Sequence, residues 1–235
     1  MRIDKLLTTM GLASRSEASK AAKKGLIKVN GKVIQRADLK IDPEYDSVEY
    51  MGRTVEYKKN IYIMLNKPSG IVSSTDGKDG ITVISLLDEE LQKCGLFPCG
   101  RLDKDTVGLL LLTNDGSAAH YLLSPKRHVS KIYRVKTEHP VSQNDINRLE
   151  SGIKLDKGDT ALPAKVEQIS ENELFITIVE GMYHQIKRML EAVGNKVVFL
   201  ERVEFGKIPL DTTLERGEWR YLTEDEIALL LEQTK

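Results

Sequence analysis

The sequence of 235 residues has little of what marks exported, membrane-spanning or metal-binding proteins. It contains only two cysteines, Cys94 and Cys99, which cannot supply a four-thiolate zinc site. The N-terminus lacks the apolar core of an export signal, so we expect both thiols to be free in a reducing cytosol. No apolar run approaches the roughly 18 residues that a membrane span needs. We therefore expect a cytoplasmic protein with no membrane partner.

Cofactor and metal signatures are also missing. The chain has no glycine-rich dinucleotide motif, no P-loop and no cluster of metal-ligating residues. Its four histidines are scattered, which favours surface positions or contacts with a partner over metal binding: His120, His128, His139 and His184. The sequence thus predicts chemistry that needs no cofactor and no metal.

The chain has enough hydrophobic residues to form a buried core. Hydrophobic residues make up 40% and charged residues 30% of the sequence, and its length suits one large domain or a small one plus a medium one. The polar residues 58–60 precede a strongly β-prone run at 61–65. We predict a small N-terminal domain over 1–57, a linker at 58–60 and a larger domain over 61–235.

The net charge is zero, but the charge is unevenly distributed. Residues 1–40 hold ten Lys and Arg against three acids, a net charge of +7 that the rest of the chain cancels. A basic lobe on an acidic body predicts that the lobe binds a polyanion. A solvated basic surface with no particular partner is the alternative.

The basic N-terminal region predicts two short helices followed by a hairpin. Apolar residues recur at helical spacing from Ile3 to Met10, and Ser14 with Glu17 has the spacing of a capping box. Asn30-Gly31 lies between two β-prone runs, which is a strong hairpin signal.

This arrangement resembles the S4 RNA-binding domain. The residues that carry the resemblance are Arg2-x-Asp4-Lys5-x-Leu7, the Ser14-Arg15 pair and the Val29-Asn30-Gly31 turn. The resemblance implies that RNA is the polyanion, and that basic side chains of this lobe contact it: Arg2, Lys5, Arg15, Lys23 and Lys24.

The most unusual stretch of the chain precedes an apolar run, Leu109–Leu112, which predicts a strand buried on both faces. Four charges occupy five positions just before it: Arg101, Asp103, Lys104 and Asp105. Charged side chains beside a core strand destabilise the fold unless they are solvated, form ion pairs or serve a function. A charged surface turn is the alternative, but the flanking Gly100 and Gly108 indicate a backbone that needs glycine conformations.

The same stretch resembles the active-site signature of pseudouridine synthases, in particular the RsuA-like branch that modifies ribosomal RNA. The matching residues are Gly100-Arg101-Leu102-Asp103, then Thr106-x-Gly108-Leu109-Leu110-Leu111, then Thr113-Asn114-Asp115-Gly116. The resemblance implies that Asp103 is the catalytic residue. Arg101, two residues earlier, is expected to assist there and to contact the substrate.

Two further motifs of that family have counterparts. Lys131-x-Tyr133 resembles the second motif, which implies that Tyr133 lines the active site rather than serving only as a core aromatic residue. Glu180-Gly181-x-x-His184-Gln185-x-Lys187-Arg188-Met189 resembles the third, whose basic residue pairs with the catalytic Asp. We assign that role to Lys187, with Arg188 as the alternative, because many branches of the superfamily have Arg there.

Other substrate contacts are implied less directly. The Asn66-Lys67-Pro68 loop lies near the cleft in this family, although by itself it is an ordinary turn. Leu200 matches an apolar residue that packs under the substrate, and an ordinary core leucine would look the same. We therefore include four more residues among the expected substrate or RNA contacts: Lys67, Gln185, Arg188 and Leu200.

The resemblance implies a specific reaction. The base of a uridine leaves C1′ through N1, turns and rebonds through C5, so no atom is added and no cofactor is needed. A carboxylate at the ribose, a flat side chain at the base and a cation beside the carboxylate suit this chemistry. Asp103, Tyr133 and Lys187 are these types, and whether Asp103 attacks C1′ or removes a proton at C2′ stays open.

The expected fold is α+β: a small N-terminal S4 (α-L) domain plus a synthase domain with a largely antiparallel mixed β-sheet flanked by helices. The expected function is isomerisation of one uridine in 16S rRNA, acting as a monomer on ribosomal RNA or a small-subunit assembly intermediate. Alternatives are a 23S rRNA enzyme of the same family and a non-catalytic S4-type RNA-binding or ribosome-assembly protein. A glycosidase would need a second carboxylate, for which Asp105 is the near candidate.

Overall fold

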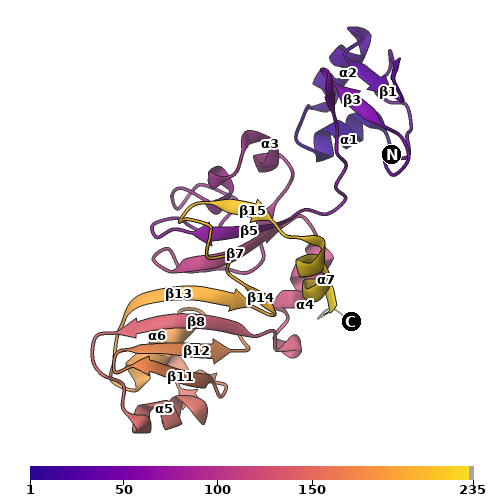
Figure 1. The fold of residues 1–235 in the computed structure, drawn as a ribbon. Helices are drawn as coiled ribbons and strands as arrows, with labels where there is room; N and C mark the ends of the chain where they lie inside the picture. The colour runs from indigo at the N-terminus through magenta and orange to yellow at the C-terminus, as the bar shows by residue number, and fades with distance from the viewer. Residues whose placement is uncertain (233–235) are drawn as a thin grey trace. The chain divides into compact units, whose positions relative to one another are not determined.

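The computed structural model describes residues 1–232, except for the side chain of Lys157. The chain forms two compact units (Figure 1). The first contains Met1–Ile61 and Ile84–Phe97, and the second contains Tyr62–Val83 and Pro98–Lys235. Among the described residues, no helix is long and apolar enough to cross a membrane.

The first unit has the helices and the hairpin that the sequence predicts. Helices α1 (Ile3–Thr9) and α2 (Arg15–Lys23) precede strands that pair antiparallel in the order β2-β1-β3-β4. These strands are β1 (Ile27–Val29), β2 (Lys32–Val33), β3 (Val48–Tyr50) and β4 (Arg53–Thr54). The unit also includes a short helix α3 (Glu89–Gln92), and a 3₁₀ turn lies at Val83–Leu86, where the two units meet along the chain.

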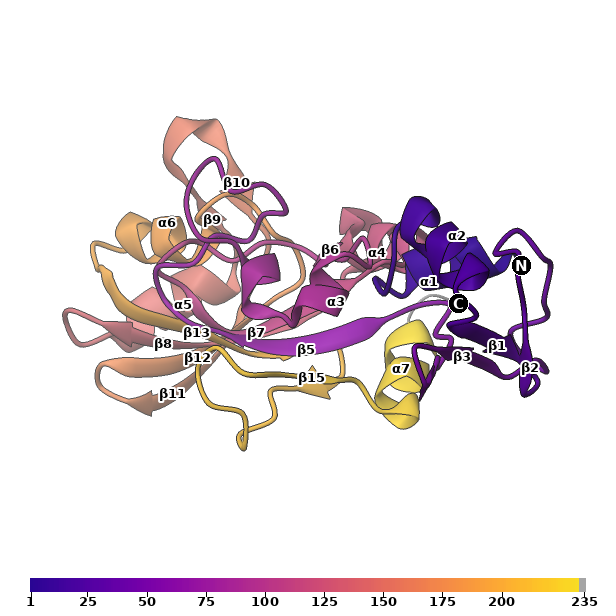
Figure 2. The same cartoon turned by 90° about the horizontal axis from the view of Figure 1, so that it is seen from above.

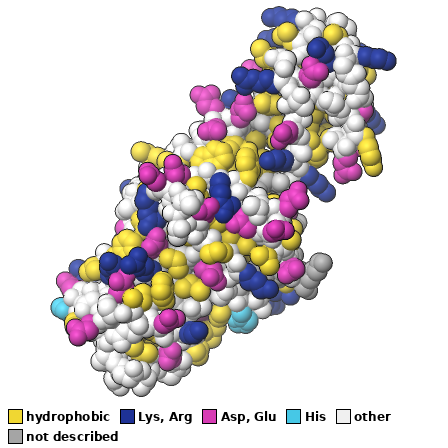
Figure 3. Space-filling model, viewed as in Figure 1, with side chains coloured by type: hydrophobic (Ala, Val, Ile, Leu, Met, Phe, Trp, Pro, Cys, Tyr) yellow, Lys and Arg dark blue, Asp and Glu magenta, His cyan; other side chains and the backbone are white. Residues whose placement is uncertain are grey.

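Local sequence signals explain this unit. The Ser14 hydroxyl accepts a hydrogen bond from the Glu17 N–H, and the Glu17 carboxylate accepts one from the Ser14 N–H at 2.7 Å, so the predicted capping box begins α2. The apolar stripe of α1 packs with the alanines of α2 in one core. That packing leaves the basic side chains outside: Lys5, Arg15, Lys23 and Lys24 are all exposed, and basic residues are visible over this unit in Figure 3.

The second unit is built on a nine-stranded sheet, with main order β11-β12-β8-β13-β7-β5-β15. Its strands are β5 (Tyr62–Lys67), β6 (Phe97–Pro98), β7 (Val107–Thr113), β8 (Lys131–Thr137), β11 (Lys165–Ser170), β12 (Glu173–Ile178), β13 (Val197–Phe205), β14 (Ile208–Pro209) and β15 (Trp219–Tyr221). The β13–β7 pair is parallel, whereas the pairs β11–β12, β12–β8, β13–β8, β13–β14, β5–β7 and β15–β5 are antiparallel. The sheet is therefore mixed and largely antiparallel, as predicted.

Helices cover both faces of this sheet. Figure 2 shows α4 (Gly116–Leu123) and α6 (Gln185–Ala192) on one side and α7 (Glu224–Glu232) on the other. Helix α5 (Gln143–Glu150) follows β8, and the short hairpin of β9 (Ile153–Lys154) and β10 (Thr160–Ala161) follows α5. Further 3₁₀ turns lie at Pro125–Arg127 and Asp156–Gly158.

Burial along the strands follows the sequence pattern. Every residue of β7 is buried, as its apolar run predicts, and β8 alternates, with Tyr133 and Val135 buried and Ile132 and Arg134 half-buried. Gly108 allows β7 to lie beside β13, because a Cβ at this residue would lie 2.4 Å from the Arg202 carbonyl oxygen. Its φ of +98° and the +87° of Gly100 confirm that both positions use glycine conformations.

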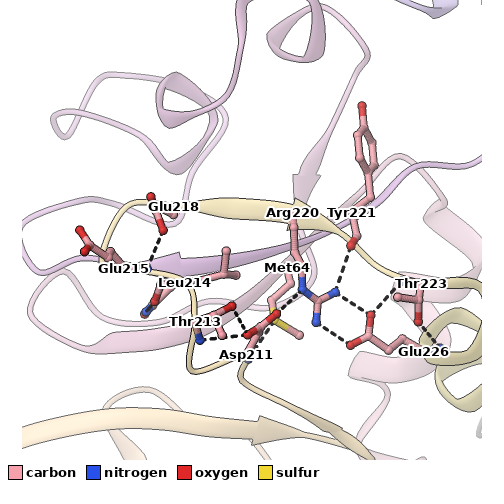
Figure 4. A network of polar contacts seen from close by, with 11 residues as sticks. Met64, Asp211, Thr213, Leu214, Glu215, Glu218, Arg220, Tyr221, Thr223 and Glu226 are labelled. Atoms are coloured by element: carbon pink, nitrogen blue, oxygen red, sulfur yellow. Dashed lines mark hydrogen bonds and ion pairs between the residues drawn. The ribbon is translucent and has the colours of Figure 1, made fainter.

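A charged network fixes the C-terminal part of this unit. The Arg220 guanidinium donates to Asp211 at 2.6 Å and to both carboxylate oxygens of Glu226, in the first turn of α7, at 2.7 and 2.8 Å (Figure 4). Hydrogen bonds from Thr213 and then Arg220 lower the pKa of Asp211 to about 2. Strand β15 is thereby tied to the preceding loop and to the start of α7.

Candidate active site

A small pocket in the second unit brings four separate segments together. The loop before β7 contributes Asp103, β8 contributes Tyr133, and the turn that begins α6 contributes His184 and Gln185. Leu200 of β13 completes the wall. Segments far apart in the sequence thus place an acid, an aromatic ring and an apolar side chain around one cavity.

Lys187, rather than Arg188, pairs with Asp103. The Lys187 ammonium lies 3.2 Å from Asp103 Oδ2, and it donates to Asp105 Oδ1 and Oδ2 at 2.7 and 2.9 Å. Burial acts to lower the pKa of Lys187, but the hydrogen bonds and charges of both carboxylates outweigh it, so this pKa lies above its ordinary value. Lys187 therefore carries its positive charge at neutral pH, between the two acids.

Arg188 forms its ion pairs with other acids and not with Asp103. Its guanidinium donates to Asp156 at 2.5 Å and to Asp159 at 2.6 Å, and it also donates to the Tyr183 carbonyl oxygen at 3.3 Å. These contacts tie α6 to the segment after β9 and hold the turn that precedes the helix. The alternative assignment of Arg188 as partner of Asp103 has no support in this geometry.

His184 is a second group at Asp103, and the sequence interpretation did not place it there. Its Nε2 lies 3.5 Å from Asp103 Oδ1, so each carboxylate oxygen faces a different basic side chain. His184 has a left-handed backbone with φ of +50° at the start of α6. Its ring stacks on that of Tyr183, with centroids 3.8 Å apart, and Tyr183 is largely exposed at 75%.

Tyr133 and Leu200 form an apolar side of the pocket. Each is buried, with 8% of its surface exposed, and they lie on the neighbouring strands β8 and β13. Thr106 also lines the pocket, and its side-chain oxygen is buried and has no hydrogen-bond partner within residues 1–232.

Lys67 has a different position from the one the sequence suggests. It ends strand β5, has no exposed surface, and lies beneath the loop of Asp103 rather than in the pocket wall. Its ammonium donates to four carbonyl oxygens, those of Pro68 at 3.1 Å, Asp103 at 3.1 Å, Lys104 at 3.2 Å and Thr106 at 2.8 Å. Lys67 thus ties the end of β5 to the backbone of Asp103 and of the residues that follow it.

The other expected contacts fall into two groups. Arg101 is exposed at the pocket, while Gln185 is buried and links the Met182 N–H to Glu180, which holds the turn before α6. Arg2, Lys5, Arg15, Lys23 and Lys24 all belong to the first unit. Of these, Arg2 is paired with Asp4 at 2.5 Å.

Two buried cations lie on the same face of the sheet as Tyr133 and Leu200. Lys131 donates to the Val129 carbonyl at 2.7 Å, and Arg202 donates to the Leu109 carbonyl at 2.7 Å. Burial, with a smaller contribution from the Arg202 charge, lowers the pKa of Lys131 to about 8. In the unfolded chain this lysine has its ordinary pKa of about 10.5.

This difference predicts a pH effect on stability. Between pH 8 and 10.5 the unfolded chain binds more protons at Lys131, so its contribution makes the folded state more stable as pH rises. The free energy of unfolding of the wild type, measured relative to that of Lys131→Met, should rise by on the order of 2 kcal/mol from pH 8 to pH 10.5. Urea unfolding in a Cys99→Ala background checks this without the nearby thiol, whose pKa burial raises to about 11. A difference that does not change with pH would contradict it.

Comparison with known proteins now identifies the family. Residues 61–192 match the model of RNA pseudouridylate synthase, and residues 1–46 match the S4 domain. The chain belongs to the RNA pseudouridylate synthase family. The first match contains Asp103, Asp105, Tyr133 and Lys187 but not Leu200, and the second contains the whole basic region 1–40.

Relatives of this synthase match it along nearly its whole length. It is 45% identical to an uncharacterized RNA pseudouridine synthase of Bacillus subtilis, with 99% of each chain covered. It is 42% identical to the ribosomal small subunit pseudouridine synthase A of Escherichia coli K12, with 97% of this chain and 99% of that one covered. A crystal structure of a pseudouridylate synthase matches with a TM-score of 0.70 and 39% identity, covering 98% of this chain and 99% of the other.

Proposed function

We propose that this synthase converts one uridine of small-subunit 16S rRNA to pseudouridine. The observation that carries the proposal is the Asp103 carboxylate in a pocket, beside the Tyr133 ring and 3.2 Å from the Lys187 ammonium. Its similarity to the small-subunit enzyme of Escherichia coli over nearly the whole chain supports the choice of RNA. We further propose that it acts in the cytoplasm as a monomer.

The pocket suits a uridine that has been turned out of its stack. Base-modifying enzymes reach their target atom by extruding the nucleotide, and an apolar wall then receives the base. We assign that wall to Tyr133 and Leu200, with Tyr133 against the base. Thr106, which is buried, also lines this pocket.

Asp103 is the reacting group in this proposal. Its carboxylate acts at the ribose, either on C1′ or on the proton of C2′, while the base detaches at N1 and rebonds at C5. Lys187 stabilises the carboxylate's negative charge where little water reaches the pair, because the side chains of Lys187 and Asp103 are only 20% and 25% exposed. The proton on C5 is released in the final step, and no metal or redox group takes part in these steps.

The basic residues of the first unit supply the RNA contact. Lys5, Arg15, Lys23 and Lys24 are exposed in a unit that matches the S4 domain, and lysine and arginine contacts to phosphates dominate affinity for RNA. We propose ribosomal RNA or a small-subunit assembly intermediate as their partner. Binding should therefore weaken steeply as salt is raised.

Tritium at C5 of uridine provides the test. We would prepare 16S and 23S rRNA with this label, each naked and as ribonucleoprotein, and measure tritium released by the purified protein. Release from 16S rRNA in either form, and none from 23S rRNA, is the expected result. Release from 23S rRNA alone would assign the protein to a large-subunit target, and salt-sensitive binding without any release would leave only an RNA-binding protein.

A further inference from the structure

Asp105 lies two residues after Asp103, and the reaction described above gives it no part. Its side chain is 69% exposed, yet both of its oxygens contact the Lys187 ammonium, at 2.7 and 2.9 Å. The nearest carboxylate to Lys187 is therefore Asp105 and not Asp103, which lies at 3.2 Å. The cation that serves the reacting acid is anchored by a second acid.

Such an exposed contact contributes little to folding. Ion pairs with a solvent-exposed partner are worth about 0–1 kcal/mol, because water screens them and two side chains lose freedom. Partial burial acts to raise the pKa of Asp105, and hydrogen bonding to Lys187 outweighs it, so the pKa of Asp105 lies below its ordinary value. Asp105 is thus ionised at neutral pH, and its main effect is on where Lys187 lies.

The chemistry of lysine explains why a second anchor is useful. An ammonium is a compact charge on a flexible four-carbon stem, whereas a guanidinium binds a carboxylate with a rigid pair of donors. Lys187 meets Asp103 through a single oxygen. With both oxygens of Asp105 also contacting the ammonium, Lys187 stays at the position where it can stabilise charge on Asp103.

We propose that Asp105 is a positioning residue for the isomerisation, holding the Lys187 ammonium at the catalytic carboxylate. This inference rests on the proposed function. Without Asp105, Lys187 samples other rotamers, so Asp103 is more often without its cation. The loss concerns the reaction itself and not the binding of RNA.

The test compares Asp105→Asn with wild type in tritium release under saturating and limiting RNA. We expect kcat to fall by about 10- to 100-fold, because small displacements of catalytic groups have effects of this size, with KM nearly unchanged. Asp225→Asn makes the same change at an exposed residue of α7 and should leave both constants unaltered. An Asp105→Asn kcat equal to that of wild type would overturn the proposal.

A double variant separates positioning from general loss of charge. With Lys187→Arg, the guanidinium can bind Asp103 through two donors, so adding Asp105→Asn should lower kcat much less than it does beside Lys187. An equal loss in both backgrounds would contradict a positioning role. If the wild-type protein released no tritium from any RNA, the proposed function itself would be wrong.

The contact can also be tested without RNA. In the wild type, Lys187 should react slowly with an amine-acylating reagent, and Asp105→Asn should speed that labelling several-fold, as mass spectrometry of the modified peptide would show. Unchanged labelling of Lys187 would overturn the proposed anchoring even if the enzyme proves inactive on every RNA tested.

Discussion

Replacing Asp103 with Asn is expected to abolish tritium release from 16S rRNA while leaving the RNA bound. The amide keeps the size of the side chain but can neither attack C1′ nor take a proton at C2′. We expect kcat to fall by at least about 1,000-fold, the upper range for the loss of a group that acts on the reacting atoms. Tritium release under single-turnover conditions measures this loss directly.

Two controls make the Asp103 result specific. Affinity for RNA should stay within about twofold of wild type, because basic contacts to phosphates dominate it. Asp225→Asn, the same exchange at an exposed position on α7, should retain full activity. Substantial release by Asp103→Asn would show that another group performs the reaction, and equal loss of RNA binding would indicate a structural role.

Replacing Lys67 with Met should reduce both stability and activity. Methionine fills a similar volume but donates no hydrogen bond, so four carbonyl oxygens around Asp103 lose their donor. Leaving a buried acceptor without its donor costs about 1–3 kcal/mol, so the free energy of unfolding should fall by a few kcal/mol. The freed loop should also misplace Asp103 and lower kcat by about 100-fold.

Urea unfolding and tritium release at a temperature where the variant is folded separate these two effects. Lys207→Met is the matched control, since that lysine is 61% exposed, and it should change stability by less than about 0.5 kcal/mol. A Lys67→Met protein with wild-type kcat would show that the loop keeps its position without the ammonium. An unfolding free energy equal to that of wild type would contradict the burial argument.

The protonation of Lys67 predicts how activity depends on pH, because this ammonium holds the loop that contains Asp103. Burial lowers its pKa to about 8, so the ammonium begins to lose its proton in mildly alkaline solution. A neutral amine has fewer donors for the four carbonyls. Loss of activity above this pH is therefore a further consequence of the position of Lys67 beneath Asp103.

Much of the fold and of this site follows from local sequence signals. The capping box at Ser14, the alternating strand at Tyr133 and the buried run of β7 all appear where propensity and hydrophobic spacing place them. Asp103, Tyr133 and Lys187 lie in three motifs that a resemblance identifies together, and the sheet brings the three segments to one pocket. The mixed, largely antiparallel sheet follows from the same resemblance.

The remainder depends on tertiary contacts that spacing does not encode. Lysines are almost always exposed, so nothing in Asn66-Lys67-Pro68 indicates an ammonium with no exposed surface among four carbonyls. His184 contacts Asp103 from a left-handed backbone conformation at the start of α6, which residue spacing does not predict. The sequence signal that could have placed His184 at the active site was its position in the third motif, beside Gln185 and close to Lys187. The choice between Lys187 and Arg188 likewise required the positions of Asp156 and Asp159.

Mapping pseudouridine at single-nucleotide resolution in 16S rRNA tests the central claim most directly. Unmodified 16S rRNA, naked and as an assembly intermediate, would be incubated with wild type or with Asp103→Asn and then analysed by mass spectrometry of its fragments. We predict one new pseudouridine with wild type and none with Asp103→Asn. Unmodified 16S rRNA after incubation with wild type, or the same pseudouridine formed by Asp103→Asn, would contradict the account.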